Sequence, residues 1–283
     1  MMKSKWNVLL LLLAVNLMAF SNSAVAQKSI ELKYQLKQGE QFTNVSNIEQ
    51  TIQFEAMGQK VTLDQEMSFY LESVIDSVKN EQITQRTTFK RIVMDQRIFG
   101  MEIKYDSEDS STFNSPMGTE FATQMNKLIN ASVISVMDER GHVIDMDISA
   151  LGNAGEMSST LNTGNNYAVY PDHKIKVGES WEEELEPMET SNMAVKVKYT
   201  LKKATRKEAV LEVDGVLSAN IDNPEAGGEL DGTMTGEMTI DRKTGMVKVS
   251  SLQLDMTMDV EQNGMKFPAT ATSFVDTKIE KVK

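Results

Sequence analysis

Few residues in this chain could act as nucleophiles or carry protons in a reaction. It has no cysteine and only two histidines, His142 and His173. No G-x-S-x-G motif places a serine on a nucleophile elbow, although a triad could still assemble in space from distant residues. His142 follows Gly141 in an expected turn, and His173 follows Pro171-Asp172 in an expected loop. We therefore predict that both histidines are solvated loop residues, and we expect no enzymatic activity.

The run WEEELE, residues 181–186, offers carboxylates at strand spacing. Carboxylates two positions apart on one strand face lie about 6.6 Å apart, within the range of acid–base pairs that cleave glycosides. Three acidic residues on one face more often mark a solvated surface, and acid–base catalysis also needs a cleft that shifts a pKa. A hydrolase that uses Asp or Glu carboxylates in a cleft remains the alternative function. One face of this strand carries Glu182, Glu184 and Glu186, and the other carries Trp181, Glu183 and Leu185.

Metal binding has little support from residue spacing. The two histidines stand far apart without cysteine, which matches no common zinc site. The acidic loop DSEDSS, residues 106–111, could offer oxygen ligands to calcium. It lacks the regular ligand spacing and the turn glycine of an EF-hand loop, so an ordinary solvated loop is the simpler interpretation. We expect no metal and no cofactor.

Methionine is unusually frequent, with 20 in the chain. Thioethers can bind Cu(I), but these methionines alternate with Thr and Asp, which places them on the apolar face of strands. Filling of the core is one interpretation. The other is an adaptable wall that accepts a lipid or another apolar ligand, because methionine is flexible and polarizable. The predicted ligand face consists of Met234, Met238, Leu252, Leu254, Met256 and Met258.

Alternation of apolar and polar residues dominates the chain and predicts β-strands. Apolar residues and glycines hold every second position over 230–240, and apolar residues do so again over 252–260. Short turn signals such as Met57-Gly58 and Asn263-Gly264 separate the alternating runs, which is typical of antiparallel hairpins in a meander. Val247 and Val249 have the opposite parity to the run that follows, and we predict a β-bulge at Ser250-Ser251.

Two stretches depart from this rhythm. Residues 116–132 place apolar side chains at helical spacing after Pro116, and we predict a helix there that covers the apolar face or plugs one end of the sheet. Residues 149–171 are rich in Gly, Asn and Ser around a second short helix, and are interpreted as a linker or crossing segment closed by Pro171.

A phrase occurs twice, as KQGEQF at 37–42 and as KVGESW at 176–181. In each copy we expect the glycine to form a turn and the aromatic residue to enter the next strand. Similar turns follow each copy in the same order, which indicates two diverged copies of one β unit. The predicted organisation is a first unit at 27–148 that contains the helix, a linker at 149–171, and a second unit at 172–283.

The N-terminus reads as a secretory signal peptide, residues 1–26. A basic start precedes a short apolar run and the A-x-A site formed by Ala24 and Ala26, with Gln27 next. The run is shorter than the roughly 20 residues of a membrane span, so no transmembrane span is expected after cleavage. The missing cysteine excludes a lipoprotein acylated on an N-terminal Cys. We predict a periplasmic or secreted protein.

Cleavage of the predicted signal peptide removes Lys3 and Lys5, which changes the formal net charge from −12 to −14. This acidity argues against nucleic acid and anionic membrane surfaces as partners.

Several phrases together resemble a family of exported Bacteroidota proteins of unknown function. The recognisable mark of that family is Pro-x-x-x-Val-x-Val-Gly-x-Ser-Trp, which reads PDHKIKVGESW here, residues 171–181, with Ile175 in place of Val. The resemblance brings no activity and no catalytic residues. The expected long curved strands also resemble, in architecture only, the half-barrels of periplasmic lipoprotein carriers.

The sequence therefore predicts a mainly β protein with one or two short helices. Its antiparallel meander would form a curved sheet or open barrel from two related halves. Three functions remain open: a carrier of a lipid or other apolar ligand, an interaction or scaffold module with an envelope protein partner, and the hydrolase named above.

Overall fold

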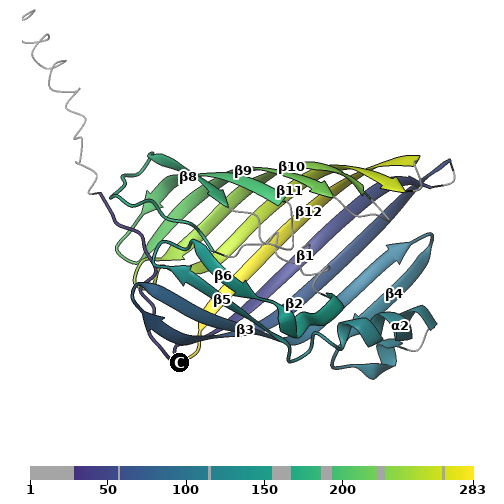
Figure 1. Cartoon of the computed structure of the whole chain (residues 1–283), viewed down its shortest axis with the longest axis horizontal. Helices are drawn as coiled ribbons and strands as arrows, with labels where there is room; N and C mark the ends of the chain where they lie inside the picture. The colour runs from purple at the N-terminus through teal and green to yellow at the C-terminus, as the bar shows by residue number, and fades with distance from the viewer. Residues whose placement is uncertain are drawn as a thin grey trace, which may run out of the picture.

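The structure is a computed structural model of the chain, and it is mainly antiparallel β, as the alternation predicts (Figure 1). The predicted signal peptide, with Ala24, Ala26 and Gln27, lies outside the described residues. No helix among the described residues is long and apolar enough to cross a membrane. The structure describes residues 29–56, 58–113, 116–154, 167–185, 193–221, 227–262 and 265–283.

Twelve strands form one sheet, with the order β6-β5-β3-β2-β1-β12-β11-β10-β9-β8-β7, and β4 pairs with β3 beside this path. The strands are β1 (Gln41–Ala56), β2 (Gln59–Lys79), β3 (Gln82–Ile98), β4 (Met101–Asp106), β5 (Ser132–Asp138), β6 (Val143–Asp147), β7 (Ser180–Leu185), β8 (Met193–Ala204), β9 (Glu208–Ile221), β10 (Gly227–Asp241), β11 (Val247–Gln262) and β12 (Met265–Lys281).

The sheet consists of two meanders joined at its centre. Strands β1 to β6 lie on one side and β7 to β12 on the other, and the first strand pairs with the last. Figure 1 shows the sheet curling, so that β5 and β6 stand in front of the wall formed by the central strands. One face therefore points inward, and the apolar parity of the long strands lies on it.

The predicted bulge exists, but two residues earlier than expected. Val249 pairs with Thr239, whereas Val247 pairs with Ile240, so Lys248 is the extra residue. Val247 is buried and Val249 is exposed. The prediction put both valines on one face because they share a parity, and the bulge between them removes that equivalence.

The repeated phrase forms the same turn twice. Gly39 and Gly178 both have positive φ, 84° and 93°, a conformation that glycine adopts without steric cost. In both copies the glutamate after the glycine accepts a hydrogen bond on its side chain from the lysine N–H, at 3.2 Å for Glu40 and 2.8 Å for Glu179. The predicted turns are confirmed, while the duplication of the two halves stays a prediction.

The helices are short and lie at one flank of the sheet. Helix α2 (Pro116–Met125) ends earlier than the predicted range, and the 3₁₀ helices are η1 (Ser110–Phe113) and η2 (Ser149–Ala154). Met125 and Leu128 pack with Phe69 and Ile92 of the inward face of β2 and β3. The helix therefore covers one flank, and it does not close the end of the sheet.

Two extended segments close that end, residues 29–36 and 167–175, here called the plug. Ile30 and Ile175 exchange two backbone hydrogen bonds, which join the segments. The backbone N–H of Tyr34 donates a hydrogen bond to the Glu139 carbonyl in the β5–β6 turn. The backbone N–H of Gln35 donates to the Thr244 carbonyl in the β10–β11 turn. Tyr34 and Tyr170 pack together and form one core with the inward side chains of the sheet.

Candidate functional site

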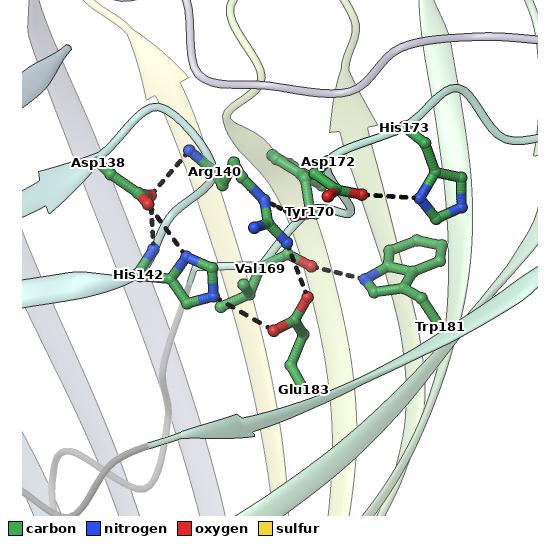
Figure 2. Close-up of polar contacts among 9 residues, drawn as sticks. All are labelled: Asp138, Arg140, His142, Val169, Tyr170, Asp172, His173, Trp181 and Glu183. Atoms are coloured by element: carbon green, nitrogen blue, oxygen red, sulfur yellow. Dashed lines mark hydrogen bonds and ion pairs between the residues drawn. The ribbon is translucent and has the colours of Figure 1, made fainter.

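A cluster of charged side chains connects the two edges of the sheet, next to β6 and at β7. Asp138 ends β5, Arg140 and His142 lie in the β5–β6 turn, and Glu183 comes from β7, the opposite edge strand. Arg140 donates to Glu183 at 3.1 Å, and the His142 ring contacts Asp138 through Nδ1 at 3.1 Å and Glu183 through Nε2 at 3.2 Å (Figure 2). We call these four residues the clasp.

Strand parity brings Glu183 into the clasp. It shares a face with Trp181, whose ring stacks on Tyr199 and donates through Nε1 to the Val169 carbonyl at 2.8 Å. That anchoring turns this face of β7 inward, so Glu183 is only 16% exposed. Its neighbours Glu182 and Glu184 are exposed, as predicted.

The electrostatics of the turn favour the charged form of Asp138. Burial opposes ionisation of Asp138, but hydrogen bonds from the His142 ring and from the backbone N–H groups of His142 and Arg140 outweigh it. The pKa of Asp138 is therefore held below its usual value. Arg140 also donates to the Tyr170 carbonyl at 2.7 Å, which attaches the clasp to the plug.

The contacts of the clasp suit a structural role better than a catalytic one. Both ring nitrogens of His142 face carboxylates, so the ring presents neither nitrogen to a nucleophile or substrate in this arrangement. His142 was predicted as a solvated loop residue. It does lie in a turn, but its ring is paired on both sides and 35% exposed. His173 matches that prediction better, because it is exposed and contacts only its neighbour Asp172 among the described residues.

The carboxylates of the acidic loop at 106–111 are engaged within the protein, and both Asp106 and Glu108 form ion pairs with Arg91. Asp106 pairs with Arg91 through two hydrogen bonds of 3.0 and 2.6 Å, and Asp109 accepts the N–H of Ser111 within the loop. Within the described ranges, no group of three or more His, Asp or Glu residues could hold a metal ion.

The predicted ligand face is brought together on two adjacent strands. Met234, Met238, Leu252 and Leu254 are buried, whereas Met256 and Met258, farther from the plug, are partly exposed. All six lie on the inward side of β10 and β11. Whether they contact a ligand stays a prediction.

Gly232 and Gly236 leave no free space on this face. A methyl group at Gly236 would lie 2.9 Å from the Cα of Leu252, and one at Gly232 would lie 3.0 Å from Cγ of Met256. Backbone and side-chain atoms of β11 therefore occupy the room that the two glycines provide.

Uncharged polar residues on the inward face were not among the predicted site residues. A belt of buried Ser, Thr, Asn and Gln side chains crosses β5, β3, β2, β1, β12 and β11, and a second row of glutamines crosses β1 to β3. The alternation of each strand indicates these positions, because the residues occupy the same face as the apolar side chains of their strands. The belt consists of Ser135, Gln85, Ser73, Asn44, Ser46, Thr277 and Ser250.

Comparisons with known proteins give a family match over part of the chain. Residues 150–247 match the model of DUF6263, a family of unknown function. This is less than half of the chain. No curated protein matches.

Among solved structures, the chain is similar to that titled "Lipid-protein interactions in lipovitellin", with a TM-score of 0.51 and 9% identity. The likeness covers 87% of this chain but only 25% of the lipovitellin chain. A candidate exported protein of Bacteroides fragilis with a YmcC-like fold is 7% identical over 86% of this chain and 97% of its own, with a TM-score of 0.18. That score is too low to carry an argument, so the comparisons show a fold shared with part of lipovitellin and a partial match to DUF6263.

Proposed function

We propose that the protein is an exported, non-catalytic carrier that holds an apolar ligand against the inward face of its curved sheet. The observation that carries the proposal is the gradient of burial along β11. Leu252 and Leu254 are buried, while Met256 and Met258 on the same face remain partly exposed. Partly exposed apolar side chains on an inward face suit a ligand that completes their burial.

The packing of the described helices supports this assignment. Helix α2 packs on β4 and η1, and η2 packs on β5. The described helices thus cover the β2–β4 flank, and the methionines lie on the other flank. Methionine side chains adapt to ligands of varied shape. The lipovitellin structure, whose title concerns lipid–protein interactions, supports a lipid as the ligand.

Two further features support the non-catalytic and exported parts of the proposal. The carboxylates of the clasp are engaged by Arg140 and His142, which leaves the hydrolase alternative without a free acid–base pair there. The signal-peptide pattern over 1–26 supports export to the periplasm or beyond.

Native mass spectrometry tests the proposal on residues 27–283, purified from an exporting host without detergent. A carrier should show excess mass that is released as lipid on denaturation, or should bind the fluorescent apolar probe N-phenyl-1-naphthylamine. A bare polypeptide mass together with no probe binding would overturn the proposal. That result would favour the interaction module with an envelope partner, whose interior is filled by side chains.

A matched pair of variants locates the site. Met256→Asp should weaken probe binding about tenfold or more, because a methionine buried against a ligand contributes about 1.5–3 kcal/mol. Thr257→Asp places the same charge on the exposed face of the same strand, and should leave binding unchanged. Equal effects of the two variants would remove the methionine face from the site.

A further inference from the structure

A row of glutamines crosses the inward face beside the ligand face. Gln50 of β1 pairs in register with Gln65 of β2, and Gln65 pairs with Gln96 of β3. On the other side of β1, Gln50 pairs with Ser273 of β12. The three glutamines hold the same parity as apolar neighbours such as Ile48. Three adjacent strands therefore present amide groups inward at one level.

The glutamine row keeps hydrogen-bonding capacity. All three side chains are partly exposed. Gln50 donates to the Ser273 hydroxyl at 2.8 Å, and Gln65 donates to the sulfur of Met94 at 3.2 Å, which is a weak acceptor. An amide has two N–H donors and a carbonyl acceptor, so these contacts leave groups on both glutamines for another molecule.

Two buried carbonyl oxygens of the belt lie outside the head-group site, because Asn44 stands six residues from Gln50 along β1, about 20 Å away. Asn44 is 7% exposed and Gln85 is 2% exposed. The side-chain oxygens of both residues have no hydrogen-bond partner among the described residues. A buried polar atom without a partner costs about 1–3 kcal/mol, and both atoms would accept a hydrogen bond from a donor.

The charges of these strands lie on the other face. Glu49, Glu66 and Arg97 alternate with the glutamines and are exposed on the outer face. The inward side of β1 to β3 is therefore neutral and polar at this level. The inward side of β10 and β11 is apolar, and β12 is the single strand between β1 and β11. With strands about 4.8 Å apart, the two regions lie within the length of one amphiphile.

We propose that the ligand is an uncharged amphiphile. Its hydroxyl- or amide-bearing head group lies on the glutamine row, and its hydrocarbon chain lies on the methionine face. This inference rests on the proposed function and names the class of its ligand. A phosphate head group fits poorly, because no lysine or arginine accompanies the glutamines on this face among the described residues.

Competition against N-phenyl-1-naphthylamine tests the inference with two amphiphiles that differ by one phosphate. 1-Monooleoylglycerol should displace the probe at a concentration at least about tenfold lower than 1-oleoyl-lysophosphatidic acid. Glycerol alone should not compete, because the head group without its chain lacks the apolar contacts. Equal competition by the two amphiphiles would overturn the inference while leaving the carrier proposal intact. Failure of the probe to bind, together with a bare polypeptide mass, would instead be a failure of the carrier proposal.

Variants of the row provide the second readout. The double variant Gln50→Leu, Gln65→Leu should weaken monooleoylglycerol binding about fivefold or more for each hydrogen bond lost, and should weaken lysophosphatidic acid binding much less. Gln53→Leu is the control, because Gln53 is exposed on the outer face of β1. A double variant that retains the wild-type preference between the two amphiphiles would contradict the assignment of the head-group site.

Discussion

Single residues of the clasp carry the contacts between the two outermost strands of the sheet order. Arg140 and His142 reach Glu183 from a turn 41 or more positions earlier in the sequence. No spacing rule reveals such a contact, because it depends on how far the whole sheet curls. The sequence did show that Glu183 shares the face of Trp181, and only the structure shows that this face points inward.

Removal of the clasp charge should lower stability. Glu183→Gln should decrease the free energy of unfolding by about 1–3 kcal/mol, because Arg140 and His142 lose a charged acceptor in a half-buried setting. Glu182→Gln is the control, since Glu182 is exposed on the opposite face. Urea denaturation of both variants measures the difference, and equal midpoints would show that the clasp contributes nothing to stability.

The clasp should also give stability a defined pH dependence. The pKa of Asp138 is lowered in the folded state, so the unfolded state binds more protons between the two pKa values. Its contribution is therefore complete above the unfolded pKa of about 3.9 and is lost as the pH falls through the lower folded value.

Asp138→Asn isolates this effect. Its side-chain oxygen can still accept the N–H groups of Arg140 and His142, as Oδ1 of Asp138 does. The variant should lose less stability than wild type between pH 5 and pH 2 in denaturation series. A wild-type acid profile in the variant would assign the pH dependence to other carboxylates.

At the level of elements, the strands and their pairing with the next strand in the chain were predictable, but the pairing of β1 with β12 was not. The alternation over 230–240 and 252–260 identified β10, β11 and their apolar faces correctly, because side chains alternate across a strand. Residues 30–36 also alternate, as Ile30, Leu32, Tyr34 and Leu36 are all buried. A period of two predicts an extended segment. It does not predict that the segment lies across the end of the sheet as part of the plug.

The plug requires a glycine at the β5–β6 turn. Gly141 has a φ of 97°, and a methyl group there would lie 2.6 Å from the Ala168 carbonyl oxygen and 2.7 Å from the Tyr34 ring. Gly141→Ala should therefore cost about 1–2 kcal/mol for the left-handed backbone and about 1–3 kcal/mol more for the clash.

Gly100→Ala measures the backbone cost alone. Gly100 has a φ of 74°, and a methyl group there meets no heavy atom within 4 Å. Thermal unfolding should rank Gly141→Ala well below Gly100→Ala. If the two variants melt together, the plug tolerates movement away from this turn.

For the whole molecule, the fold class was predictable from the sequence, and the proposed class of ligand rests on strand registers that only the structure gives. The meander, the short helix and the absence of a nucleophile motif were visible in the sequence. The glutamine row has no signature within any one strand, because Gln50, Gln65 and Gln96 align only through the registers of three strands. The apolar parity of each strand had marked these positions as inward.

Ligand binding should protect one end of the sheet more than the other. With monooleoylglycerol bound, amide hydrogen exchange should slow over residues 48–54 of β1 and 254–258 of β11, which present the proposed site. The plug at 29–36 is already buried and hydrogen-bonded at both neighbouring turns, so its exchange should change little. Uniform slowing across the chain would indicate global stabilisation without a localised site.

The pairing of β1 with β12 determines when the sheet can be completed. Thr43 and Glu280 are neighbours in space and 237 positions apart in the chain, so the centre of the sheet closes only after nearly every residue is available. Until then, each meander has an unpaired strand edge. Pairing between strands so far apart in the sequence is slow, and an unpaired edge is prone to pair with the wrong strand. During synthesis or export from the N-terminus, the sheet can therefore be completed only after β12 is available to pair with β1. Removal of β12 would take away the one strand that pairs with both β1 and β11.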